Sequence, residues 1–484
     1  MEGANDSYQN IKFESASEAS GSFQVLFSTG DEEFKGIHGD LGLQDLKSDG
    51  IFRHYSESTR FVVIRPPFPL SENVLQLVIP KVVAEAQKLK AQSLEIVLPE
   101  SIDQTLCGLM AYTINITNYS WDLKTQGSTR SSLNNVVFVH SKGEAYLASD
   151  DFRFHYLVSC QQNLSRDLHN TRGNTGTVRY FIEKATQFKI QSGDKVGLKV
   201  FHGEKELLDE GLRLIHAVGK GSSEAPALIN LTYNGNPDSE EYVAIVGKGV
   251  TFDQGGMNSK TAMLEYLFTD KGGASSVFAA FQGIVALGLK INVVCSLAMA
   301  ENVVSGTAYR PGDIITSHKG LTVEITNTDG EGRLILSDAM SWVQSNYKVD
   351  TLIDVATLTG AIVVGLGATY SGIFGNNQQI CDQVIAAGKL YSEKHWKMPF
   401  CDITDMMMKG KHSDLINYGP VPYGGAIQAA SYLKSFVNKD VKYVHLDIAG
   451  TSYSLAPMGM FTGKGSKGYA CATLLGYIKT RTSQ

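Results

Sequence analysis

Short β-branched runs alternate with longer helical segments through the second half of the chain, and this order constrains the fold more than any other feature. Strand-like runs occur at residues 197–201, 227–233, 242–246, 291–299, 322–326, 351–356 and 443–448. Segments with a helical pattern lie near 204–216, 272–288, 332–346, 378–394, 425–438 and 468–480. The alternation predicts an α/β domain with a central mixed sheet flanked by helices. Ligands of such sheets bind in the loops beyond the carboxyl ends of the strands.

The length of 484 residues predicts two or three domains, because domains usually contain about 100 to 200 residues. The first part indicates a smaller α/β domain, with strands at 60–65, 94–98 and 135–140, a helix at 71–91, and irregular polar sequence before residue 60 except for the strand-like run 23–27. Helical segments at 157–168 and 177–188, with a polar break between them, indicate a connector. We therefore expect an N-terminal α/β domain at 1–160, a helical linker at 161–190 and a larger C-terminal domain at 191–484.

Composition and charge narrow the class of protein. A hydrophobic content of 43% and a charged content of 19% are those of an ordinary globular protein. The formal net charge of -6 argues against nucleic acid or an anionic membrane as the main partner.

The sequence also favours a soluble, cytoplasmic protein. Its first residues lack the basic and apolar segments of a secretory signal. The most apolar run, 355–374, has too little bulky apolar surface for a membrane span, and we interpret it as buried strand and loop. Six scattered cysteines without C-x-x-C spacing suit a reducing compartment.

One turn between a strand and a helix, residues 326–334, concentrates charge. If its backbone stays extended, Asp329, Glu331 and Arg333 project from the same face, and the glycines between them leave that face open. By itself the pattern also fits a solvated acidic turn with a local Glu-Arg pair.

Two further segments carry acidic residues near strand ends. The glycine-rich loop after the strand 242–246 contains Lys248 and Asp253, with Lys260 shortly after it. It fails the P-loop pattern, and Asp253 would repel a phosphate but would suit a hard cation. Asp270 begins an alanine-rich helix, where it could simply be the N-cap.

Together these segments direct four carboxylates toward one crevice: Asp253, Asp270, Asp329 and Glu331. Four close carboxylates cannot all ionise without cations, so two divalent metal ions, zinc or manganese with magnesium as a further possibility, are expected. The H-E-x-x-H pattern is absent, and the isolated histidines His318, His412 and His445 are expected to be structural.

The segments Gly247-Lys248-Gly249-x-Thr251-Phe252-Asp253 and Asn327-Thr328-Asp329-x-Glu331-Gly332-Arg333-Leu334 resemble the signatures of the leucyl aminopeptidase (cytosol aminopeptidase) family. The resemblance covers about 205–480 and includes the segments 300–302, 310–313, 354–361, 424–427 and 445–451. It implies a two-metal exopeptidase that releases N-terminal residues, preferably leucine and similar apolar ones, from short peptides.

The resemblance also implies a role for each residue of the metal site. One metal would be bound by Lys248, Asp253, Asp270 and Glu331, and a more exchangeable one by Asp253, Asp329 and Glu331. A lysine ligand must lose its proton, so metal affinity should fall with acidity. From the residues alone, Lys248 would be interpreted as a salt-bridge partner.

Two further groups would act on the substrate, again by resemblance. Lys260 would stabilise the oxyanion that forms from the scissile carbonyl, and Arg333 would hold a bicarbonate that serves as general base. The resemblance assigns substrate binding to Asn327, Leu267, Thr357, Leu358, Gly360, Ala449 and Ser452. It implies a homohexamer built as a dimer of trimers.

Three positions depart from the family pattern. Gly330 stands where alanine is usual, which should loosen the turn slightly. The segment from Lys260 to Asp270 is one residue shorter than usual, which affects the pocket around Leu267. Lys271 stands where methionine is usual, and we expect it to point outward into solvent.

Two other functions are compatible with parts of this pattern. The fold could serve as a structural or DNA-binding scaffold, although such a protein would be expected to have lost some ligands. Phosphoesterase chemistry would use the carboxylates but leaves Lys248 unexplained.

Overall fold

The computed structural model describes residues 11–16, 23–27, 51–55, 60–64, 71–98, 102–128 and 130–482. The chain divides into two compact units, one of residues 1–163 and 455–465 and the other of residues 164–454 and 466–484. Within the described residues, no helix is both long and apolar enough to cross a membrane.

The smaller unit contains a six-stranded sheet in the order β1-β6-β5-β2-β4-β3, in which only β3 and β4 pair antiparallel. Its strands are β1 (Lys12–Ala16), β2 (Phe23–Phe27), β3 (Ile51–Tyr55), β4 (Arg60–Ile64), β5 (Ser93–Val97) and β6 (Asn135–Val139). Its helices are α2 (Glu72–Lys88), α3 (Gln104–Asn118) and α4 (Gly143–Ala148), and α5 (Asp150–Asn170) begins there.

The sequence pattern missed parts of this unit. The expectation that 23–27 is the only strand before residue 60 is wrong, because β1 and β3 are strands as well. The rest of that stretch lies outside the described residues. Helix α3 was not predicted, because all of its residues from Cys107 to Asn118 are buried and no polar face marks a helical period.

The larger unit is built on an eight-stranded mixed sheet in the order β15-β14-β17-β13-β9-β10-β8-β7. The strands are β7 (Val196–His202), β8 (Ala227–Asn234), β9 (Glu241–Asp253), β10 (Asn292–Asn302), β13 (Lys348–Ala356), β14 (Tyr370–Gly375), β15 (Lys394–Lys397) and β17 (Lys442–Asp447). The four central strands β17, β13, β9 and β10 are parallel, so their carboxyl ends meet at one edge. The predicted α/β fold with a central mixed sheet is confirmed.

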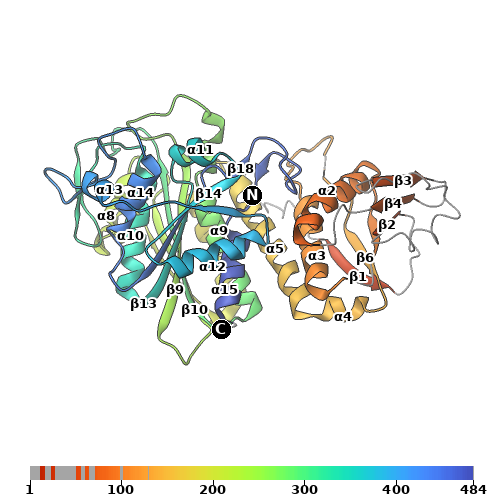
Figure 1. The fold of residues 1–484 in the computed structure, drawn as a ribbon. Coiled ribbons are helices and arrows are strands. Elements are labelled where there is room, and N and C mark those ends of the chain that lie inside the picture. Colours follow the sequence, from red (N-terminus) through yellow and green to blue (C-terminus); the bar gives the residue numbers. More distant parts are fainter. Residues whose placement is uncertain are drawn as a thin grey trace. The chain divides into compact units, whose positions relative to one another are not determined.

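Helices cover both faces of this sheet (Figure 1). One face carries α6 (Val178–Ser192), α9 (Gly272–Leu287), α12 (Gln378–Lys389) and α15 (Cys471–Thr482). The other carries α8 (Arg213–Gly219), α10 (Glu331–Asn346) and α14 (Gly425–Lys434). The buried apolar side chains of α10, among them Leu334, Leu336 and Trp342, belong to the core on that face.

Shorter elements complete the unit. They are η1 (Gly193–Lys195), α7 (Glu204–Asp209), η2 (Leu264–Thr269), β11 (Ile314–Thr316), β12 (Thr322–Glu324), α11 (Gly360–Leu366), α13 (Asp402–Met407), β16 (Leu415–Ile416), β18 (Tyr453–Ser454) and β19 (Gly465–Ser466). Helix α11 lies inside the run 355–374, so the interpretation of that run as strand and loop alone is wrong.

The glycine-rich segment after residue 246 is not a loop, as the sequence suggested, but the continuation of β9 as far as Asp253. Its glycines permit close packing rather than a turn. A Cβ on Gly247 would lie 2.6 Å from Ala274 Cα, and one on Gly249 would lie 2.2 Å from Met299 Sδ. Lys248 therefore projects from a buried central strand.

A buried carboxylate links α8 to α10. Asp338 of α10 accepts hydrogen bonds from the backbone N–H groups of Leu214 (2.7 Å) and Ile215 (3.3 Å) in the first turn of α8, and of His318 (2.8 Å). Burial nevertheless raises the pKa of Asp338 from 3.8 to about 7. The folded protein thus binds this proton more tightly than the unfolded chain does.

This shift predicts how Asp338→Asn changes thermal stability with pH. The contribution of Asp338 to stability is fully present below about pH 4 and falls as pH rises to about 7, because the folded state then has to bury a charge. Asparagine does not ionise, so the melting temperature of the variant relative to wild type should rise across this range. A difference that stays constant from pH 4 to 8 in thermal-shift measurements would contradict the proposed ionisation.

Candidate metal centre

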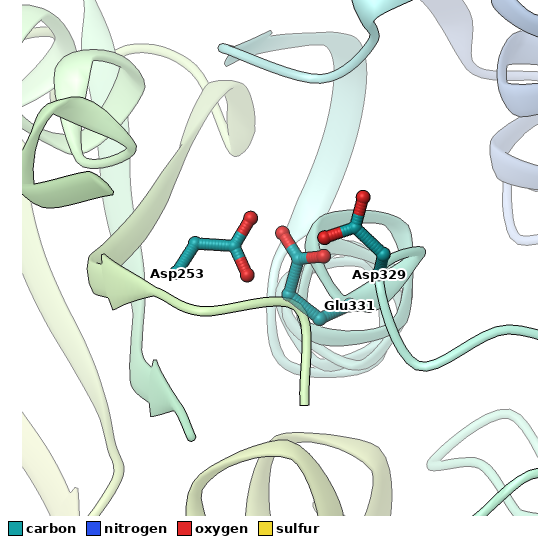
Figure 2. A group of neighbouring side chains, drawn as sticks. All are labelled: Asp253, Asp329 and Glu331. Atoms are coloured by element: carbon teal, nitrogen blue, oxygen red, sulfur yellow. The ribbon is translucent and has the colours of Figure 1, made fainter. Parts of the chain in front are cut away.

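Three carboxylates converge at the carboxyl edge of the large sheet. Asp253 is the last residue of β9, Asp329 lies in the turn before α10, and Glu331 is the first residue of α10. One carboxylate oxygen from each lies within 4.8 Å of the other two. Figure 2 shows the three groups facing a common point. Asp253 and Glu331 are buried, whereas the side chain of Asp329 is 35% exposed.

Lys248 connects the fourth carboxylate to this group. Its Nζ lies 2.6 Å from Asp270 Oδ2 and 2.8 Å from Glu331 Oε1, and it donates a hydrogen bond to the carbonyl of Thr357 (2.8 Å). The hydroxyl of Thr357 donates to Asp270 Oδ1 (2.6 Å). Asp270 is therefore held facing the cluster by Lys248 of strand β9 and by Thr357, which follows the neighbouring strand β13.

The alternative role of Asp270 as a helix cap is not observed. Helix α9 begins at Gly272, and Lys271 is its N-cap residue, without a side-chain capping bond. The carboxylate of Asp270 points instead to Lys248 and Thr357.

Lys260 occupies the open side of the site. Its ammonium group bonds Asp253 Oδ2 and Asp329 Oδ1. Two ammonium groups, those of Lys248 and Lys260, thus lie among four carboxylates and neutralise only half of their formal charge.

Crowding and burial change the pKa values of the carboxyl groups. Burial raises the pKa of Asp253 and Asp329 above 3.8, to about 6 for Asp329, and raises that of Asp270 further. Neighbouring carboxylates add to the rise at all three. Further positive charge at this point would favour ionisation of all of them.

In the two buried ion-pair partners, Lys248 and Glu331, the pKa shift favours the charged form of each. Burial alone would raise the pKa of Glu331, but Lys248 and Lys260 lower it. Burial alone would lower the pKa of Lys248, but Asp270 and Glu331 raise it. In this arrangement Lys248 is an ammonium ion, as the residues alone had suggested.

The donor set fits divalent cations. Among the described residues, Glu331 Oε2 is buried without a hydrogen-bond partner, although a buried carboxylate oxygen normally has one. Four carboxylates with one amine form an oxygen-rich set of the kind that manganese and magnesium accept and zinc tolerates. The residues present therefore suit a metal.

Arg333 lies beside the cluster but does not form the local Glu-Arg pair considered from the sequence. Helix α10 starts at Glu331, so the turn is not extended through Arg333. The guanidinium donates from Nη1 to the carbonyl of Asn417 (2.8 Å) and lies 5.3 Å from the ring centroid of Tyr418. Its Nε is buried without a hydrogen-bond partner in the described part of the chain, so this N–H is available to an anion.

Asparagine side chains shape the site, and one of them, Asn258, lies outside every motif noted in the sequence. Asn302 Nδ2 donates to Asp253 Oδ1 (2.9 Å) and to the carbonyl of Thr328 (3.1 Å). Asn258 accepts from the N–H of Thr328 (2.8 Å). Asn327, assigned to substrate binding, accepts from the N–H of Asp329 (2.8 Å) and so closes the turn. The contacts of Asn302 and Asn258 join segments that are distant in the chain, and no local spacing reveals them.

The residues assigned to the side-chain pocket lie in several elements. Asp447 accepts from the N–H groups of Leu358 (3.2 Å) and Ala449 (3.3 Å), which ties two of them together. Thr357 contacts Asp270 and Lys248, as described above. Leu267 in η2 and Ser452 are buried, whereas Gly360 is exposed at the start of α11.

The expectation that Lys271 points into solvent is wrong, because its side chain is fully buried. Its Nζ donates to the carbonyl of Phe268 (2.6 Å) and lies 5.0 Å from the centroid of that ring. Burial lowers the pKa of Lys271 to about 7. The amine thus fixes the last turn of η2, the segment that is shorter than usual, instead of meeting water.

Gly332 offers a test of how closely Lys248 packs against α10. A Cβ on Gly332 would lie 2.5 Å from Lys248 Cε and 2.7 Å from Nζ. Alanine normally stabilises a helix by about 1 kcal/mol relative to glycine. Gly332→Ala should instead lower the melting temperature, because Lys248 cannot move aside without losing its contacts to Asp270, Glu331 and Thr357, and overpacking costs about 1 to 3 kcal/mol.

Gly365→Ala is the matched control, since Gly365 also lies in a helix and a Cβ there meets nothing within 4 Å. It should leave the melting temperature unchanged or raise it. Equal melting temperatures for the two variants in differential scanning fluorimetry would refute the close approach of Lys248 to α10.

Known proteins similar to this chain share one family description. Residues 163–475 match the family described as "Cytosol aminopeptidase family, catalytic domain". A "Probable cytosol aminopeptidase" of Pseudomonas fluorescens (strain Pf0-1) is 38% identical over 72% of this chain and 69% of its own length. One from Sulfurihydrogenibium sp. (strain YO3AOP1) is 40% identical over 66% of this chain and 63% of its own length.

Solved structures resemble the whole chain. "Bottromycin maturation enzyme BotP in complex with Mn" has a TM-score of 0.82 at 26% identity and covers 96% of this chain and 100% of its own. A tomato leucine aminopeptidase mutant has a TM-score of 0.84 at 24% identity and covers 97% of this chain and 96% of its own, which shows a shared fold. With its match across residues 163–475, the chain belongs to the cytosol aminopeptidase family, a family of peptide hydrolases.

Proposed function

We propose that this protein is a metal-dependent aminopeptidase that releases leucine and similar apolar residues from the N-termini of short peptides. The observation that carries the proposal is the convergence of Asp253, Asp329 and Glu331, joined to Asp270 through Lys248. Membership of the cytosol aminopeptidase family and the manganese named with one similar structure support it.

The proposed ligands divide between two ions. Lys248, Asp253, Asp270 and Glu331 would hold one, and Asp253, Asp329 and Glu331 the other. Bound divalent ions supply Lewis acidity for peptide hydrolysis. The chain supplies the placement, because strand β9 carries both Lys248 and Asp253.

Lys260 and Arg333 are the proposed catalytic groups. The ammonium of Lys260 reaches the open side of the cluster, where it can stabilise the oxyanion that forms from the scissile carbonyl. Among the described residues the buried Nε of Arg333 has no hydrogen-bond partner, which suits a planar anion such as bicarbonate acting as general base. The charge of both groups would be needed in the transition state.

The substrate class follows from the proposed pocket residues Leu267, Thr357, Leu358, Gly360, Ala449 and Ser452, with Asn327 at the turn. Most of these are apolar or small, which favours leucine-like side chains. We further propose a cytoplasmic homohexamer, a dimer of trimers, in which residues 191–484 form the catalytic domain. A scaffold or DNA-binding role is not favoured, because every proposed ligand is present.

A direct assay tests the function. Purified protein, stripped of metal and then supplied with manganese or zinc, should release leucine from leucine amide, whereas N-acetyl-leucine amide should not react. Absence of metal-stimulated release from leucine amide would refute the proposal.

Two substitutions separate metal binding from catalysis. Glu331→Ala should lose bound manganese and activity together, because Glu331 is proposed to contact both ions. Arg333→Ala should keep the manganese, because Arg333 is not among the proposed metal ligands. Its main effect should be a lower kcat. Metal content by mass spectrometry and steady-state kinetics measure both effects, and equal metal loss in the two variants would contradict the division.

A further inference from the structure

The short strand β16 runs beside the strand that leads into the acidic turn. It pairs in parallel with β12, with Leu415 opposite Val323 and Ile416 opposite Glu324. The next N–H, that of Asn417, still donates to the carbonyl of Glu324 (3.1 Å). Beyond this point β12 has ended and the turn begins, so ordinary strand pairing stops.

Where the strand pairing stops, the side-chain amide of Asn417 forms the next hydrogen bonds to this segment. Its Oδ1 accepts from the N–H groups of Thr326 (2.8 Å) and Asn327 (3.2 Å). Its Nδ2 donates to the carbonyls of Asn327 (2.6 Å) and Gly330 (3.4 Å). Asn417 is fully buried, so these bonds have no competition from solvent. One amide group therefore substitutes for a peptide group and holds both ends of the turn.

The same short segment also holds Arg333. The main-chain carbonyl of Asn417 accepts from Arg333 Nη1 (2.8 Å), and the ring of Tyr418 lies 5.3 Å from the guanidinium carbon. The N–H of Tyr418 donates to the hydroxyl oxygen of Thr326 (3.2 Å), and this hydroxyl donates to the carbonyl of Tyr418 (2.8 Å). Residues 417 and 418 thus contact the turn on one side and Arg333 on the other.

Gly330 fits this arrangement. Its φ of −100° is open to any residue, so backbone strain does not require a glycine. A Cβ at this position would, however, lie 2.9 Å from Asn417 Nδ2. The glycine that departs from the family pattern leaves room for the amide.

We propose that Asn417 is a positioning residue that sets the orientation of Asp329 and Glu331 relative to Arg333. It touches neither the proposed substrate nor the proposed metals, and acts by fixing the backbone between them. The inference deepens the proposed aminopeptidase function and rests on it for its kinetic consequences, whereas its structural consequence is independent of any activity.

Two variants of Asn417 test the proposal. Asn417→Asp keeps the shape but replaces the Nδ2 donor by an oxygen that repels the carbonyls of Asn327 and Gly330. Asn417→Ala removes the amide altogether. Because small misplacements of reacting groups are costly, kcat should fall about 10- to 100-fold in both, with a smaller change in KM.

Asn376→Ala is the matched control. Asn376 makes a similar clasp, accepting from the N–H of Tyr443 (2.8 Å) and donating to the carbonyl of Val441 (2.9 Å), but in the strands away from the turn. It should lower the melting temperature without lowering kcat. A loss of kcat in Asn376→Ala equal to that in the Asn417 variants would mean that general destabilisation is responsible, and would overturn the proposal.

Hydrogen exchange of the metal-free protein supplies a readout that does not depend on activity. Amides of a peptide covering residues 324–331 should exchange faster in Asn417→Asp than in wild type or Asn376→Ala. Unchanged exchange in this peptide would overturn the positioning role. Faster exchange in a protein whose wild type shows no aminopeptidase activity would leave the positioning role standing and refute only the proposed function.

Discussion

The main constraint on the structure is the mutual repulsion of four carboxylates in a largely buried space, which has to be compensated. Asp253, Asp270, Asp329 and Glu331 come from different elements, and only two ammonium groups lie among them. Such a cluster is unfavourable unless cations compensate it, so a fold that retains it must gain something from the cations. Four carboxylates placed in this way favour a metal-binding role over a structural one.

Close packing of backbone makes that cluster possible. Lys248 reaches three partners from the middle of a central strand because Gly247 and Gly249 let β9 lie against its neighbours and Gly332 leaves space for the amine. Two short amide side chains also contribute. Asn302 donates a hydrogen bond to Asp253, and Asn417 donates one to the carbonyl of Asn327 in the turn that carries Asp329. The proposed metal ligands are thus positioned by strands, glycines and asparagines.

The sequence predicts those features of the fold and of the site that a local pattern of residues encodes. The alternation of strands and helices indicated the large sheet, and Asp253 and Asp329 were recognised because each follows a strand-like run. The sequence does not predict features that depend on contacts between residues far apart in the chain. Lys271 was expected in solvent, but its burial depends on the carbonyl of Phe268 and the segment that covers it. Asn417 lies about 90 residues from the turn that it holds, and a lone asparagine carries no periodic signal.

Anomalous diffraction from crystals of the manganese-loaded protein tests the central claim most directly. The account predicts two manganese peaks among the carboxylate oxygens of Asp253, Asp270, Asp329 and Glu331, with Lys248 Nζ at ligand distance from one of them. A single peak, peaks elsewhere, or a Lys248 still paired only with Asp270 and Glu331 would contradict it.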